Sequence, residues 1–128
     1  MKDIPPGLAL QLDIAPEERH TASALGNVGV DVVSTPALIG YLETASHRAI
    51  LPYCDAGEAT VGTRVEVDHL APAFLGQPVT ASARLLSIDG RKIMFEVEAT
   101  QAGKVVMKGR HGRAIVQLDR LLGKKSAG

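Results

Sequence analysis

Hydrophobic residues alternate with polar ones along most of this chain, in five segments that read as β-strands. The first segment is short, with an apolar residue at every second position from Leu8 to Ile14. A period of two is typical of a strand with one buried face. Four longer alternating segments follow, at 60–70, 79–88, 92–101 and 104–118. Gly90 and Gly103 lie between the last three, where tight hairpins favour glycine. The pattern therefore predicts an antiparallel sheet.

One segment between the first strand and the others has the period of a helix. Ser34, Thr35 and Pro36 form a helix start, because Thr35 can cap the free N–H groups and proline suits the first turn. We expect the helix to run to about Leu51, where Pro52 ends it. Its apolar stripe consists of Leu38, Tyr41, Leu42, Ala45 and Ala49. The order of strand, helix and four strands predicts an α+β fold, with a single long helix wrapped by an antiparallel β-sheet.

The size and charge of the chain restrict what it can do. Its 128 residues suffice for one domain with its own core. We expect that domain to span 1–128, with a core at about 12–121 and a flexible tail at 122–128. Lys and Arg number 14, as do Asp and Glu. Because no basic excess is available to hold a phosphate backbone, nucleic acid is not an expected partner.

Cysteine and histidine usage bears on cofactors and location. Cys54 is the single cysteine, so it cannot form an internal disulfide, which favours a reducing compartment. Polar residues and prolines interrupt the first 13 positions, so we expect neither a signal peptide nor a membrane span, and a cytoplasmic protein. His20 and His111 lack the spacing of metal ligands, and no metal or other cofactor is expected.

Thr35, Glu43 and His69 carry the hydroxyl, carboxylate and imidazole that an acyl-transfer site needs. Thr35 and Glu43 would lie about 12 Å apart along the helix axis and about 80° apart around it, so they would flank a substrate. Odd positions along the next strand, including Val61 and Thr63, share a face with His69, which would point toward the helix. The helix start adds free N–H groups and a positive dipole end, which suit a carbonyl oxygen that gains negative charge.

Each of these three residues also has a simpler interpretation. Thr35 can be a helix cap and nothing more. Glu43 can pair with His47 four positions further along the helix surface. His69 can be a packed or solvated residue at a strand end.

Two further residues are candidates for binding a substrate. Gly62 would allow a close backbone approach from the strand, or it marks a bulge. Arg113 alternates with apolar residues on the last strand. It is therefore either an inward anchor for a carboxylate or phosphate, or an ordinary edge arginine.

The chain resembles the hotdog-fold thioesterases, most closely the fluoroacetyl-CoA thioesterase type. The resemblance covers about residues 12–121 and is carried by STPALIGYLETASHRAILPY, GEATVGTRVEVDHLAPAFLGQPVTASARL and HGRAIVQLDR. In that family the catalytic set is a Thr at the helix start, a Glu eight residues later and a His on the following strand, and a Gly seven residues before the His lines the site. Thr35, Glu43, His69 and Gly62 match with the same spacings, and Arg113 matches an arginine of the last strand.

The resemblance implies a homodimer that hydrolyses a small or medium acyl-CoA thioester, with the acyl tunnel between protomers. Thr35 and backbone N–H groups would hold the oxyanion, Glu43 would act as nucleophile or as base for water, and His69 would protonate the departing thiolate. The fluoroacetyl-specific enzyme has aromatic residues in the loop before the helix. Residues 26–30 contain none, so fluoroacetyl selectivity is not implied.

Two other functions stay open at this point. One is a non-catalytic hotdog module that binds acyl-CoA or another small ligand. The other is a hotdog dehydratase or hydratase, whose sites rest on an Asp-His pair with a different spacing.

Overall fold

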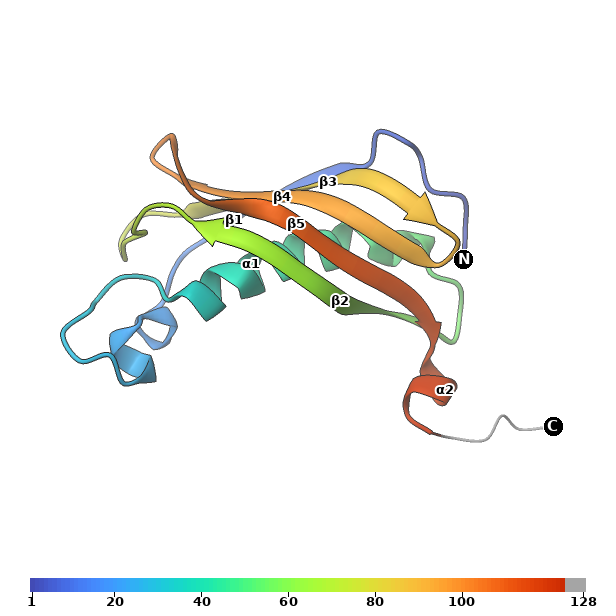
Figure 1. Ribbon diagram of the computed structural model, residues 1–128, viewed down its shortest axis with the longest axis horizontal. Coiled ribbons are helices and arrows are strands. Elements are labelled where there is room, and N and C mark those ends of the chain that lie inside the picture. Colours follow the sequence, from blue (N-terminus) through green and yellow to red (C-terminus); the bar gives the residue numbers. More distant parts are fainter. Residues whose placement is uncertain (124–128) are drawn as a thin grey trace.

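The computed structural model describes residues 1–123 as a curved, five-stranded antiparallel sheet that packs on one long helix (Figure 1). The strands lie across the sheet in the order β1-β3-β4-β5-β2. The predicted α+β architecture is confirmed. In chain order the elements are β1 (Ala9–Ile14), α1 (Thr35–Ile50), β2 (Glu58–His69), β3 (Val79–Asp89), β4 (Lys92–Gln101), β5 (Lys104–Gln117) and α2 (Leu118–Leu121), with 3-10 turns at Glu18–His20, Ser23–Leu25 and Leu51–Tyr53.

The long helix starts where the sequence predicts, but its cap is a different residue. Ser34 has an extended backbone, and its side chain accepts a hydrogen bond from the N–H of Ala37 at 3.1 Å. Thr35 is the first helical residue, so the prediction that Thr35 caps the helix is wrong. Because Ser34 supplies the cap, the Thr35 hydroxyl is available for another partner.

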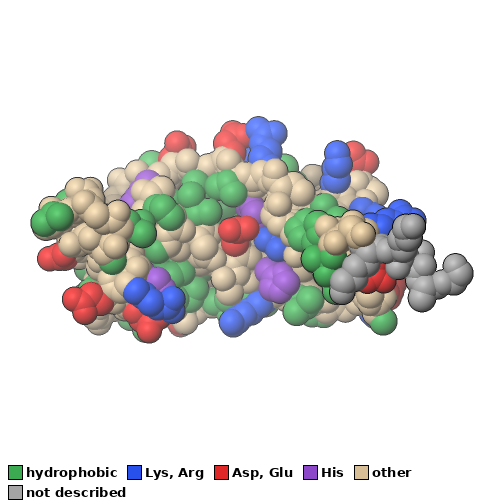
Figure 2. All heavy atoms as spheres, turned by 90° about the horizontal axis from the view of Figure 1, so that it is seen from below, with side chains coloured by type: hydrophobic (Ala, Val, Ile, Leu, Met, Phe, Trp, Pro, Cys, Tyr) green, Lys and Arg blue, Asp and Glu red, His purple; other side chains and the backbone are tan. Residues whose placement is uncertain are grey.

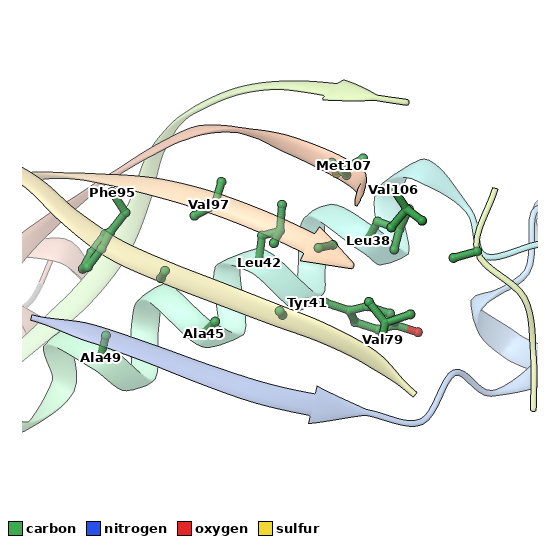
Figure 3. Packing of buried hydrophobic residues seen from close by; sticks show 14 of the residues in the cluster. Leu38, Tyr41, Leu42, Ala45, Ala49, Val79, Phe95, Val97, Val106 and Met107 are labelled. Atoms are coloured by element: carbon green, nitrogen blue, oxygen red, sulfur yellow. The ribbon is translucent and has the colours of Figure 1, made fainter. Parts of the chain in front are cut away.

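The apolar face of α1 forms the core with the concave face of the sheet (Figure 3). The stripe predicted from the helical period is buried in full. Facing it are aliphatic side chains of β3, β4 and β5, with Phe95 the largest fully buried side chain. Each large apolar side chain in such a core stabilises the fold by roughly 1.5–3 kcal/mol. The labelled members of the cluster in Figure 3 are Leu38, Tyr41, Leu42, Ala45, Ala49, Val79, Phe95, Val97, Val106 and Met107.

Strand β2 reverses the direction of its side chains at Thr63. Its register against β5 shifts between Gly62 and Arg64, so Thr63 is the extra residue of a β-bulge. Before the bulge Gly62 faces α1, and beyond it His69 does. The prediction that Val61 and Thr63 share the face of His69 is therefore wrong, because an inserted residue inverts the alternation of the strand.

Of the predicted flexible tail, residues 124–128 lie outside the described residues, and Leu122 and Gly123 follow directly on α2. No helix within 1–123 has both the length and the apolar character needed to cross a bilayer.

Candidate active site

Thr35 and His69 meet at the start of α1. The Oγ1 atom of Thr35 lies 2.7 Å from Nδ1 of His69, which is a short hydrogen bond between the helix start and the end of β2. Which of the two atoms donates depends on the tautomer of the imidazole. The structure thus brings two of the three predicted catalytic side chains into direct contact.

The same helix start leaves one backbone donor for a ligand. Ala37 and Leu38 donate their N–H groups to the side chain and the carbonyl of Ser34, and Pro36 has no N–H. The N–H of Thr35 has no acceptor among residues 1–123. This N–H, together with the Thr35 hydroxyl, offers hydrogen bonds at the positive end of the helix dipole.

Glu43 belongs to a second group of polar side chains, two turns further along α1. Its Oε2 atom lies 3.5 Å from Nη1 of Arg113 and 3.8 Å from Nε2 of His111. The Glu43 side chain is 45% exposed, whereas the other two are buried. In the described chain Glu43 therefore pairs with Arg113 on the sheet, and not with His47 on the helix surface.

The guanidinium group of Arg113 is buried and bonded on several sides. Its Nε donates to the hydroxyl of Thr60 at 2.9 Å, and its Nη2 donates to the carbonyl of Thr60 at 3.0 Å. Its Nη1 donates to Nε2 of His111 at 3.1 Å and to Glu43. Burial lowers the pKa of Arg113, and Glu43 opposes this shift. Of the two alternatives for Arg113 the inward position is the one observed, and its role in binding a substrate stays a prediction.

Gly62 provides the space in which this second group meets. A Cβ atom at Gly62 would lie 2.7 Å from Oε2 of Glu43 and 3.2 Å from Cε1 of His111. Real Cβ atoms do not approach other atoms so closely, so only glycine fits here without a shift of Glu43. Both sequence-based alternatives for Gly62, a close approach and a bulge, are present at this position.

We expect Gly62→Ala to displace the Glu43 carboxylate without unfolding the chain, because the obstructing atom is the end of a flexible side chain. A misplacement of about 1 Å costs on the order of 10²-fold in rate, so kcat of a reaction that uses this carboxylate should fall by about that factor. The matched control is Gly40→Ala, where the new Cβ meets nothing within 4 Å. An unchanged kcat for Gly62→Ala, with a normal melting curve, would contradict this assignment.

His111 is the member of the site that sequence reasoning missed. Its spacing in the sequence bears only on metal binding, yet it lies buried beside Arg113, with 2% of its surface exposed. Its Nδ1 is 2.8 Å from the carbonyl oxygen of Arg64. The signal that identifies it is the alternation of His111, Arg113 and Ile115 on one face of the last strand, which assigns all three to the interior.

The stability of the fold should depend on the protonation of His111. Burial lowers the pKa of His111, the hydrogen bond to Arg64 and the charge of Glu43 oppose the shift, and Arg113 adds to it. As the pH falls below about 6.5, the unfolded chain binds a proton that folded His111 resists, so the free energy of unfolding must fall. We expect the parent to lose more stability than His111→Gln between pH 7 and pH 5, measured by urea unfolding. Parallel curves for the two proteins would contradict this expectation.

The two groups of side chains do not touch in the described part of the chain. No hydrogen bond among residues 1–123 joins Thr35 or His69 to Glu43. Figure 2 shows acidic, basic and histidine side chains close together near the middle of the face seen from below.

Known proteins are similar to the chain over most of its length. The model of a family described as fluoroacetyl-CoA-specific thioesterases matches residues 16–119. The fluoroacetyl-CoA thioesterase of Streptantibioticus cattleyicolor is 34% identical over 90 residues, which is 70% of this chain and 65% of that protein. The aligned part is therefore slightly less than two thirds of the relative.

Solved structures share the fold. A structure of the fluoroacetyl-CoA thioesterase FlK superimposes with a TM-score of 0.87 and 27% identity, covering 95% of both chains. A hot-dog-like protein from Thermanaerovibrio acidaminovorans superimposes with a TM-score of 0.85 and 24% identity, covering 93% of this chain and 88% of its own. Variants of FlK have also been solved with acetyl-CoA and with fluoroacetate and CoA. The predicted hotdog fold is confirmed.

Proposed function

We propose that this chain, which belongs to the fluoroacetyl-CoA-specific thioesterase family, hydrolyses a small or medium acyl-CoA to the free acid and CoA. The observation that carries the proposal is the hydrogen bond between Thr35 and His69 at the helix start, with Glu43 exposed further along the same helix. Acyl-CoA as the substrate class is supported by the complex of the similar enzyme FlK with acetyl-CoA.

The carbonyl of the thioester would lie at the start of α1. There the N–H and the hydroxyl of Thr35 would donate hydrogen bonds to the carbonyl oxygen as it becomes an oxyanion. The helix dipole favours the same negative charge. Removing one such donor from an oxyanion site typically costs about 10²–10³-fold in kcat, so this arrangement can supply a large part of the catalysis.

Glu43 and His69 would carry the proton and bond changes. Because Glu43 lies about 12 Å along α1 from Thr35 of its own chain, the Glu43 that acts on this carbonyl would belong to a second copy of the chain. That carboxylate either takes a proton from a water molecule that attacks the carbonyl carbon, or attacks that carbon itself to give an anhydride that water then cleaves. In both routes the carbon–sulfur bond breaks and the CoA thiolate takes a proton from His69. The one water consumed gives its hydroxyl to the acid, and its proton, passed through Glu43 or taken up directly, restores His69. Arg113 would orient the carboxylate through the ion pair at 3.5 Å.

The acyl group of the substrate is proposed to be different from fluoroacetyl or broader in range, without selectivity for fluoroacetyl. The loop at 26–30 before the helix contains no aromatic residue that would close over a small acyl group, and Val28 within it is 89% exposed. A loop without such an aromatic residue leaves room for a larger acyl chain. We therefore expect turnover of short and medium acyl groups without preference for the fluorinated one.

We also propose that the working unit is a homodimer that pairs through β2. This strand is twelve residues long, lies at the edge of the sheet, and contains Gly62 and His69. Val65 on it is 44% exposed, and unpaired edges of such length are usually covered. Antiparallel pairing with the same strand of a second copy would be two-fold symmetric and would place the acyl tunnel between protomers.

In solution the protein should therefore have twice its chain mass of 13.5 kDa, measured by light scattering after size exclusion. Val65→Lys should convert the dimer to a monomer with little activity, because it places a charge at the pairing edge. The control is Leu86→Lys on β3, a strand with neighbours on both sides, where an exposed leucine is also replaced. A fully active monomer of 13.5 kDa would contradict the proposal.

A single domain at 1–128 that works in the cytoplasm is part of the same proposal. One core cluster connects α1 with the sheet. Cys54 is unpaired, which suits a reducing compartment. Fractionation of cells that produce the protein, with immunodetection, would test this location.

Product analysis separates hydrolysis from the two other functions. A saturated acyl-CoA and the 2-enoyl-CoA of equal length are each incubated with the protein, and free thiol and acyl products are measured. A hydrolase releases thiol from the saturated compound. A binding module shows saturable binding without thiol release, and a hydratase adds water to the enoyl group and leaves the thioester intact.

A further inference from the structure

We infer that His111 is a positioning residue, whose imidazole orients the Arg113 guanidinium and, through it, the Glu43 carboxylate beside Gly62. The inference rests on the proposed hydrolysis, because it assigns His111 a part in presenting the group that acts on the thioester. His111 makes no hydrogen bond to Glu43, and its Nε2 lies 3.8 Å from the Glu43 Oε2 atom. The hydrogen bonds of its two ring nitrogens support this positioning role.

The tautomer of His111 is fixed by its two partners. Nδ1 lies 2.8 Å from the carbonyl oxygen of Arg64, which can only accept a hydrogen bond, so Nδ1 carries the hydrogen. Nε2 lies 3.1 Å from Nη1 of Arg113, which can only donate. Nε2 therefore presents a lone pair, and the imidazole is neutral.

The bulge in β2 contributes the partner of His111. The register shift between Gly62 and Arg64 leaves the Arg64 carbonyl within reach of a side chain on β5. Gly62 in the same segment has no Cβ, so the side chains of Glu43 and His111 can approach the backbone there. One local irregularity thus anchors the imidazole and leaves space for the carboxylate.

The contacts of Arg113 show how the imidazole orients the guanidinium group. Thr60 accepts hydrogen bonds from Nε and Nη2 and so fixes one edge of the planar guanidinium. Nη1 is the nitrogen that faces Glu43, and its remaining constraint is the bond to His111. Because the guanidinium is rigid, an acceptor at His111 determines how Nη1 is presented to the carboxylate. Without it a buried N–H of Arg113 would lose its partner.

The alternative is that His111 only fills space in the core. Replacing His111 by Asn or by Gln distinguishes the two roles, because each variant keeps a different hydrogen bond of the imidazole. Asn places an amide near the position of Nδ1 and keeps the donor to Arg64, whereas Gln reaches the position of Nε2 and keeps the acceptor for Arg113. A space-filling residue would show no difference between Asn and Gln beyond stability.

The test compares His111→Asn, His111→Gln and the parent by CoA release and by melting curves. We expect kcat to fall by at least about tenfold for Asn with KM changed less than about threefold, since the contact with Glu43 acts on the transition state. Gln should restore kcat at least about tenfold relative to Asn at equal melting temperature. Leu85→Ala, a buried leucine on β3, is the control for lost stability alone and should keep kcat. Equal kcat for Asn and Gln would overturn the inference.

Imidazole ¹⁵N NMR gives a second readout that needs no substrate. The parent should show His111 protonated at Nδ1 and unprotonated at Nε2 near neutral pH, and Arg113→Lys should shift the Nε2 resonance. A hydrogen on Nε2 would overturn the inference. If the parent released no CoA from any acyl-CoA, the proposed function would fail, and this spectrum would decide the role of His111 on its own.

Discussion

Replacing Glu43 by Gln is expected to reduce CoA release by at least about 10³-fold while the protein remains folded. Gln has the same shape as Glu but no negative charge, so it can neither take a proton from water nor attack the carbonyl carbon. The side chain is 45% exposed, and Arg113 keeps its hydrogen bonds to Thr60 and His111 without it. The melting temperature should therefore change far less than the rate.

The matched control for this variant is Glu96→Gln on β4, away from the proposed pairing edge. Glu96 is also exposed and also paired with an arginine, Arg84. Exposed pairs of this kind contribute at most about 1 kcal/mol, so we expect its CoA release to equal that of the parent. A Glu43→Gln protein that hydrolyses acyl-CoA at the parent rate would exclude Glu43 from the chemistry.

Gly109→Ala is expected to have the largest effect on stability. A Cβ at Gly109 would lie 2.0 Å from the carbonyl oxygen of Glu66 and 2.7 Å from the Cα of Val67. Both atoms belong to the backbone of β2, so no side-chain rotation can relieve the overlap. The central pairing of β2 with β5 must open, and we expect a loss of more than about 3 kcal/mol, beyond ordinary overpacking. Urea unfolding measures this loss against a typical total of about 5–15 kcal/mol.

Gly40→Ala is the control for the same substitution in open space. Gly40 lies within α1, and a Cβ there meets no atom within 4 Å. Alanine in a helix interior is more stable than glycine by about 0.5–1 kcal/mol, so this variant should gain stability. If Gly109→Ala unfolds at the urea concentration of the parent, the close approach of β2 and β5 is not as described.

Local patterns were sufficient to predict the elements of the fold. The alternation in the second half of the chain marks β3, β4 and β5 to within a residue or two, because each strand buries one face. The turn between β4 and β5 falls where predicted, with φ of 49° at Ala102 and 76° at Gly103. The apolar stripe of the helix could be predicted as well, because its residues recur at helical spacing. The stripe residues Leu38, Tyr41, Leu42, Ala45 and Ala49 are all buried.

The details that position the site depend on contacts that a sequence does not display. The bulge at Thr63 follows from how β2 pairs with β5, so the direction of Gly62 could not be read from alternation alone. His111 has no neighbour in sequence that reveals its bond to the Arg64 carbonyl. Ser34 and Thr35 are both of a type that caps helices, and the hydrogen bond from Ala37 identifies Ser34 as the cap.

CoA release by the purified parent chain, from acyl-CoAs of graded length and polarity, tests the central claim most directly. We predict saturable release from short and medium acyl groups, with fluoroacetyl-CoA not preferred, as measured by a thiol-reactive dye. Absence of thiol release across the whole panel by a folded protein that still binds acyl-CoA would contradict the claim and leave a binding module as the function.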